Sequence, residues 1–193
     1  MSSIEKSQAA DTIGSAITKT LQSGESATAK GVYTMQCFDK DGDLKWEAKC
    51  PNLVVNVGLQ DMNNKYFLGS AYTATWYIGL YGSGASNSPA AGNTMASHSS
   101  WTEETGYSQA TRPACTFATP TTANPSVATN SASPAVYSIN ATATIGGAFL
   151  VSDNTKSGST GTLYSASDFT SPGDRSVVSG DTLNVTYTLS LAG

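Results

Sequence analysis

The clearest pattern in this sequence is an alternation of apolar and polar side chains near its carboxyl end. Every second residue from 183 to 191 is apolar, and the residues between them are Asn, Thr or Ser. A second alternating stretch covers residues 135–145. This period of two predicts half-buried β-strands, and further strands are expected at 72–80, 114–119, 147–152 and 162–165. Short strands at this spacing predict a mainly antiparallel β-sandwich of jelly-roll or immunoglobulin-like type over residues 31–193.

Residues 32–50 predict a β-hairpin within this domain. A three-residue turn at 40–42, with Gly42 left-handed, would place Phe38 opposite Leu44 and then Val32 opposite Cys50. In this register Cys37 and Cys50 point to opposite faces and are not expected to form a disulfide.

The turn of this hairpin is rich in acidic residues, with Asp39, Asp41 and Asp43 around Gly42. An EF-hand loop needs its glycine at the sixth position and a glutamate at the twelfth, whereas Gly42 is fourth in this run. We therefore favour a hairpin turn over an ion site for residues 39–43, and ion binding there stays open.

One short helix is expected at about residues 56–67. Asn56 is the candidate N-cap, and Gly69 stands where a left-handed residue ends a helix. The expected apolar stripe consists of Leu59, Met62, Tyr66 and Phe67.

The first 30 residues differ from the rest and predict an extended N-terminal arm. Ala10, Ile13, Ile17 and Leu21 recur at intervals of three and four, which indicates a short helix that Gly24 would end. A stripe this narrow is marginal alone, so the helix is expected to pack on its own domain or to dock on a partner. Ile13, Ile17 and Leu21 are therefore candidate partner-binding residues.

Composition and charge narrow the possible functions. The chain has 27 serines and 25 threonines, only 12% charged residues and a net charge of −4. Its ten basic residues form no patch, which removes the electrostatic basis for nucleic-acid binding. No apolar run approaches the roughly 20 residues of a membrane span, and no apolar segment of a secretory signal follows Met1. We expect synthesis and assembly in a cytoplasm, with all three cysteines as buried free thiols.

The sequence contains no recognisable catalytic, metal or cofactor site. His98 is its only histidine and is expected to be a loop residue bound to backbone. Glu103 and Glu104 are adjacent, so in an extended strand they point to opposite faces, unlike a glycosidase pair. The rings of Trp76 and Trp101 are candidates for partner contact, although positions in the sandwich core or a subunit interface are favoured for such residues.

Several segments resemble a series found in small virion structural proteins of tailed bacteriophages. The resemblance covers most of residues 50–193 in order, and none of its motifs is catalytic. Its segments are residues 52–61 (NLVVNVGLQD), 76–80 (WYIGL), 93–98 (NTMASH), 101–103 (WTE), 146–150 (GGAFL), 163–164 (LY) and 180–187 (GDTLNVTY).

This resemblance implies a non-enzymatic component of a virion. The expected role is that of a capsid decoration (cement) protein, which binds the major capsid protein and copies of itself, for example as a trimer. Its arm would span neighbouring subunits and stabilise the head, gaining affinity through multivalent contact. The alternative is a tail or head fibre module that recognises host-surface glycans. Neither role needs a cofactor, nucleic acid or a membrane.

Overall fold

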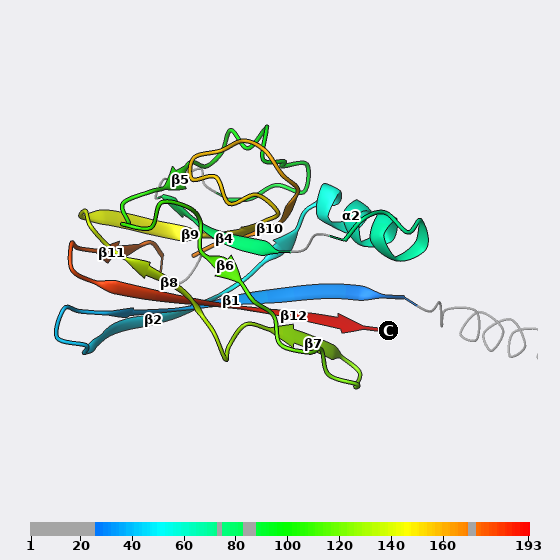
Figure 1. Ribbon diagram of the computed structural model, residues 1–193, viewed down its shortest axis with the longest axis horizontal. Coiled ribbons are helices and arrows are strands. Elements are labelled where there is room, and N and C mark those ends of the chain that lie inside the picture. Colours follow the sequence, from blue (N-terminus) through cyan, green and yellow to red (C-terminus); the bar gives the residue numbers. More distant parts are fainter. Residues whose placement is uncertain (1–25, 73–74, 83–87, 170–172) are drawn as a thin grey trace, which may run out of the picture.

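A computed structural model describes residues 26–72, 75–82, 88–169 and 173–193. Two antiparallel sheets pack face to face as a β-sandwich, which confirms the predicted fold class (Figure 1). The first and last strands of the described chain lie side by side in the lower sheet of Figure 1. The N-terminal arm lies outside the described residues up to position 25.

The lower sheet has five strands. Four of them follow the order β2, β1, β12, β7, and β8 also pairs with β12. Their bounds are β1 Thr28–Phe38, β2 Leu44–Pro51, β7 Ser126–Thr129, β8 Ala135–Ser138 and β12 Thr182–Ala192.

The upper sheet has seven strands. Five of them follow the order β3, β10, β9, β4, β5, while β11 pairs with β9 and β6 with β4. Their bounds are β3 Leu53–Val54, β4 Trp76–Gly82, β5 Glu103–Glu104, β6 Ala114–Cys115, β9 Ala143–Val151, β10 Leu163–Asp168 and β11 Arg175–Val177.

The ladder between β1 and β12 forms the centre of the lower sheet. It joins eleven residue pairs, from Thr28 opposite Ala192 to Phe38 opposite Thr182. Leu183, Val185 and Tyr187 are buried as the alternation predicts, whereas Leu191 at the end of the strand is 38% exposed. The inner face of this sheet supplies one half of the main core.

The upper sheet is buried on both of its faces. Ile78, Leu80 and Leu150 face the lower sheet in the main core. Their strand neighbours Tyr81 and Phe149 belong to a second core on the outer face. Loops that contain Met95 and Trp101 close this outer core together with Leu163 of β10, so a layer of loops covers the sheet (Figure 1).

The predicted hairpin is present, but its register differs from the prediction. Phe38 does lie opposite Leu44, and Gly42 is left-handed with φ of 90°. Lys45 is then an extra residue in a bulge, so Cys37 pairs with Trp46 and Tyr33 with Cys50.

The bulge also changes which side chains the hairpin buries. Tyr33, Met35 and Cys37 face the core together with Cys50, so the prediction that the two cysteines point apart is wrong. Both thiols are free, because Cys50 lies opposite Tyr33, which is four residues from Cys37 along β1.

The predicted helix is α2, Asn56–Phe67, and Gly69 follows it with φ of 63°. Its N-cap is Val55, with no side-chain cap, so the predicted capping role of Asn56 is wrong. The helix approaches β10 through Gly58, where an added Cβ would lie only 2.3 Å from the carbonyl oxygen of Tyr164.

Two predicted strands are shorter than the pattern indicates. The stretch 135–145 alternates only as far as Ile139, then turns at exposed residues 140–142 before β9 begins. The strand predicted at 114–119 keeps only Ala114–Cys115, because the chain then leaves β4 for the lower sheet.

We predict that Gly79→Ala destabilises the fold by about 2 kcal/mol or more. A Cβ at position 79 would lie 2.0 Å from the Phe149 ring, which is itself fully buried and has no room to move. Denaturant unfolding of the variant measures the loss. Gly92→Ala is the matched control, because a Cβ there meets nothing within 4 Å, and an equal loss in both variants would contradict the prediction.

Candidate functional site

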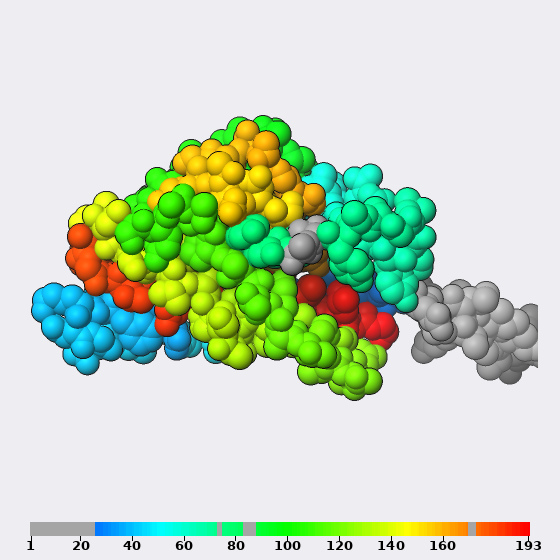
Figure 2. Space-filling model, in the orientation of Figure 1, coloured from blue at the N-terminus to red at the C-terminus, as the bar shows by residue number. Residues whose placement is uncertain are grey.

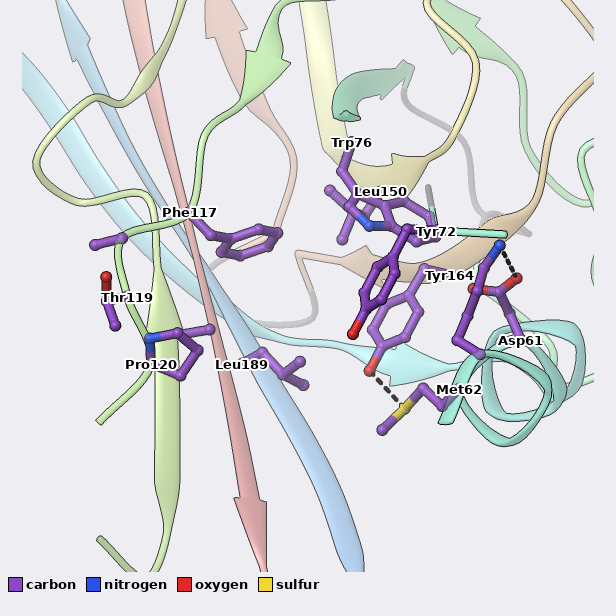
Figure 3. A pocket seen from close by; sticks show the side chains of 13 residues that line it. Asp61, Met62, Tyr72, Trp76, Phe117, Thr119, Pro120, Leu150, Tyr164 and Leu189 are labelled. Atoms are coloured by element: carbon purple, nitrogen blue, oxygen red, sulfur yellow. Dashed lines mark hydrogen bonds and ion pairs between the residues drawn. The ribbon is translucent and has the colours of Figure 1, made fainter. Parts of the chain in front are cut away.

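The best candidate for a functional site is an apolar pocket at one end of the sandwich, between α2 and the lower sheet (Figure 3). Its volume is about 590 Å³, within the range of ligand pockets. Apolar side chains make up most of its wall. They are Met62, Tyr72, Trp76, Phe117, Pro120, Leu150, Tyr164 and Leu189.

The segment after β6 forms one side of this pocket because it crosses between the two sheets. Cys115 still pairs with Trp76 in the upper sheet. Three residues later, the amide of Ala118 donates to the carbonyl of Thr129 in the lower sheet at 2.9 Å. Phe117 therefore stands between the sheets, across the pocket from α2 (Figure 3).

Several polar groups of the pocket are already paired. The hydroxyl of Tyr164 donates to the sulfur of Met62 at 3.1 Å, and Lys65 Nζ lies 3.7 Å from Asp61 Oδ1. Burial, with a smaller effect of the Asp61 charge, raises the pKa of Tyr164 to about 12. The hydroxyl thus stays protonated at neutral pH, and the pocket offers mainly apolar contact.

Exposed apolar side chains continue from the pocket onto the helix. We call Leu59, Tyr66, Phe67, Leu68 and Tyr72 the α2 patch; they are between 44% and 89% exposed. Tyr66 and Phe67 contact each other edge to face at 4.9 Å, and Tyr72 also lines the pocket. Figure 2 shows α2 at the same end of the molecule as the end of β12. The stripe that the sequence predicts as a packing face is thus largely uncovered.

The structure separates the residues predicted to bind a partner. Trp76 is half-buried in the pocket wall, with its ring 5.6 Å from that of Tyr164. Trp101 is only 2% exposed, between the rings of Tyr81 and Phe149 in the outer core, so it offers no ring to a partner. Ile13, Ile17 and Leu21 lie outside the described residues.

His98 lies where the sequence predicts, in a loop. Its Nδ1 is 2.9 Å from the carbonyl oxygen of Trp101, and its ring stacks on the indole at 3.9 Å. The indole nitrogen in turn donates to Asn93 Oδ1 at 3.2 Å. These contacts hold Trp101 in place as a core residue.

Arg112 and Glu103 form a buried ion pair that ties the outer loops together. Arg112 is 1% exposed and donates twice to the Glu103 carboxylate, at 2.8 and 2.9 Å. It also donates to the carbonyls of Asp153 and Gly158, while Glu103 accepts from the amide of Ser157. The Glu103 carboxylate thus has a structural role, because Arg112 and Ser157 take up both of its oxygens.

We predict that Glu103→Gln lowers the free energy of unfolding by about 3 kcal/mol, because it leaves the guanidinium charge buried without its counter-ion. Thermal or denaturant unfolding measures the change. The control is Asp41→Asn at the exposed pair with Lys40, where the expected change is close to zero. A Glu103→Gln variant as stable as wild type would contradict this account of the loops.

Asp181 carries a second buried charge, where the hairpin meets the turn before β12. Its Oδ2 accepts from Lys45 at 2.5 Å and from the amide of Val178 at 2.9 Å. Burial alone would raise the pKa of Asp181, but these hydrogen bonds outweigh it and hold the pKa below its usual range. Lys45, the extra residue in the bulge of β2, thus binds the carboxylate of Asp181.

We predict a pH dependence of stability that originates at Asp181. Because its folded pKa is lowered, its contribution is present above its unfolded pKa of about 3.9 and is lost as pH falls through the folded value. The difference in unfolding free energy between wild type and Asp181→Asn should therefore shrink between about pH 5 and pH 2. Chemical unfolding at a series of pH values tests this, and a difference that does not change with pH would contradict it.

The other chemical candidates of the sequence form no site in the described part of the chain. Asp39 Oδ1 accepts from the amides of Asp41 and Asp43, each at 2.9 Å, as a hairpin turn requires. No cluster of three metal-binding side chains occurs among the described residues. Burial raises the pKa of the thiols to about 12 for Cys37 and Cys115 and about 11 for Cys50.

No helix among the described residues combines the length and the hydropathy of a membrane span. No protein-family model matches the chain, and comparisons with curated proteins and with solved structures find no significant match.

Proposed function

We propose that this chain is a non-enzymatic structural protein of a bacteriophage particle, and that it decorates and stabilises the capsid. The observation that carries the proposal is the uncovered apolar end of the sandwich, formed by the pocket and the α2 patch. Five large apolar side chains of the patch are exposed within residues 59–72. Exposed apolar groups concentrated in this way typically mark a surface that binds protein.

The distribution of charge favours a protein partner whose contact does not depend on salt. From Tyr66 to Ser152 the only charged side chains are Glu103, Glu104 and Arg112. Glu103 and Arg112 neutralise each other in the interior. Contacts made by apolar and neutral groups are not screened as ion pairs are, which suits a particle exposed to varying ionic strength.

The partners under this proposal are the major capsid protein and other copies of this chain, in an oligomer such as a trimer. The part of the predicted N-terminal arm that precedes β1, residues 1–27, adds a second attachment to that of the α2 patch. Two linked attachments raise the overall affinity well above that of either one. The site of action is then the outer surface of the virion, after assembly in the cytoplasm of the host.

We predict that Tyr66→Ser/Phe67→Ser weakens binding to capsids at least tenfold, because both rings are more than 70% exposed and available to the partner. Purified heads that lack this protein are titrated with each variant, and bound protein is measured by co-sedimentation. The matched control is Leu44→Ser, another exposed apolar residue, which lies in the hairpin at the opposite end of the molecule. Unchanged binding of the double variant would rule out the α2 patch as the contact, and failure of wild type to bind heads would overturn the proposed function.

The exposed rings of Tyr66 and Tyr72 also support a second candidate, a fibre or appendage module that binds host glycans. Flat aromatic rings stack on sugar faces, and these tyrosines are 82% and 89% exposed. Binding of the isolated protein to a glycan array, lost on Tyr72→Ala, would favour this role over capsid decoration. The copy number per virion separates the two as well, because decoration proteins are far more numerous than fibre modules.

A further inference from the structure

We propose that the apolar pocket receives the N-terminal segment, residues 10–21, of a second copy of this chain. The inference rests on the proposed function for the presence of neighbouring copies, and it names the contact between them. The pocket lacks a cover among the described residues, and the sequence of residues 10–21 supplies an apolar stripe.

The chemistry of the segment matches that of the pocket. Ile13, Ile17 and Leu21 recur at intervals of four, so on a helix they form one apolar row, about 6 Å apart. The pocket is lined by the rings of Tyr72, Trp76 and Phe117 and by the side chains of Met62 and Leu189. An amphipathic helix that inserts such a row into an apolar groove is a recurrent mode of recognition.

The place where the segment leaves the body favours this pocket. Leu189, in the pocket wall, lies opposite Gly31 of β1. From Gly31 towards its start, β1 runs past the pocket wall and stays paired as far as Thr28, opposite Ala192. β1 therefore begins at the end of the molecule that carries both the pocket and α2 (Figure 1), and the residues before it are attached there.

The direction of β1 favours a second copy as the one that receives the segment. Because β1 is paired to its first residue, the chain leaves the body pointing away from its own pocket. A return to that pocket needs a reversal within residues 22–27. A second copy that faces this end receives the segment without a reversal, and reciprocal exchange gives each copy a filled pocket.

Disulfide trapping between two different chains tests the proposal. One full-length chain carries Ile17→Cys and the other carries Phe117→Cys with a tag that changes its mass. The three native thiols are buried, so the introduced cysteines are the accessible ones. After mixing and mild oxidation, we expect a covalent dimer of one chain of each kind, at least tenfold above that formed with Ser15→Cys in place of Ile17→Cys. On a helix, position 15 lies about 160° around the axis from position 17 and so faces away from the apolar row.

The failures are distinguishable. A chain that carries both Ile17→Cys and Phe117→Cys and closes only on itself would show that the segment returns to its own pocket, which overturns exchange. Cross-linking no stronger than with Ser15→Cys would overturn the pocket as the docking site. As a second measurement, sedimentation equilibrium should give wild type a mass above that of one chain, and Ile13→Ser/Ile17→Ser/Leu21→Ser should reduce it to that of one chain. A single-chain mass for wild type at about 1 mM, the order of the effective concentration of linked sites, would also overturn the proposal. These assays contain no capsids, so their outcome is independent of the head-binding titration.

Discussion

Burial of the upper sheet on both faces is the constraint on which the rest of the structure depends. A sheet that is covered on both sides cannot alternate apolar and polar residues, and β4 and β9 are accordingly apolar or glycine over most of their lengths. The close approach of Phe149 to Gly79 follows from this packing, because two layers of side chains meet the same strands. The loops over the outer face must then be held in place without a sheet of their own. Arg112 does this, with hydrogen bonds to Glu103 and to two carbonyls, of Asp153 and Gly158, in the loop between β9 and β10.

The two ends of the sandwich differ in how many apolar side chains they leave exposed to water. At the hairpin end, the turn after Phe38 is closed by Asp39, and Asp181 ties the hairpin to β12 through Lys45. At the α2 end, several polar groups are also paired, but apolar side chains remain in contact with water. Hydration of that apolar surface is unfavourable, whereas the buried carboxylate of Asp181 is paired with Lys45. The end that lacks a cover is therefore where association with another protein gains most.

The sequence predicts the sandwich, the hairpin and α2 because alternation and turn residues act locally. The predicted register of the hairpin is wrong because the pattern alone does not reveal the bulge at Lys45. Val32 and Thr34 could face inward as well as Tyr33 and Met35, so the apolar pattern does not decide which set is buried. The sequence names Trp101 as a candidate for partner contact. A simple sandwich buries one face of each sheet and so gives no reason to expect the second core that buries this ring. The unbroken apolar runs 78–81 and 148–151 are the signal of a second buried face. The pocket itself could not be predicted, since it depends on residues 116–121 leaving one sheet for the other through contacts distant in sequence.

The position of β1 determines how the domain carries mechanical load. Its hydrogen bonds run on one side to β2 and on the other to β12, perpendicular to the strand. A pull on the arm along the axis of β1 therefore stretches many of these bonds at once, in shear. A pull that separates Thr28 from Ala192 acts on one pair at a time and peels the ladder apart. The fold thus resists a force along its arm much better than a force that spreads its two ends.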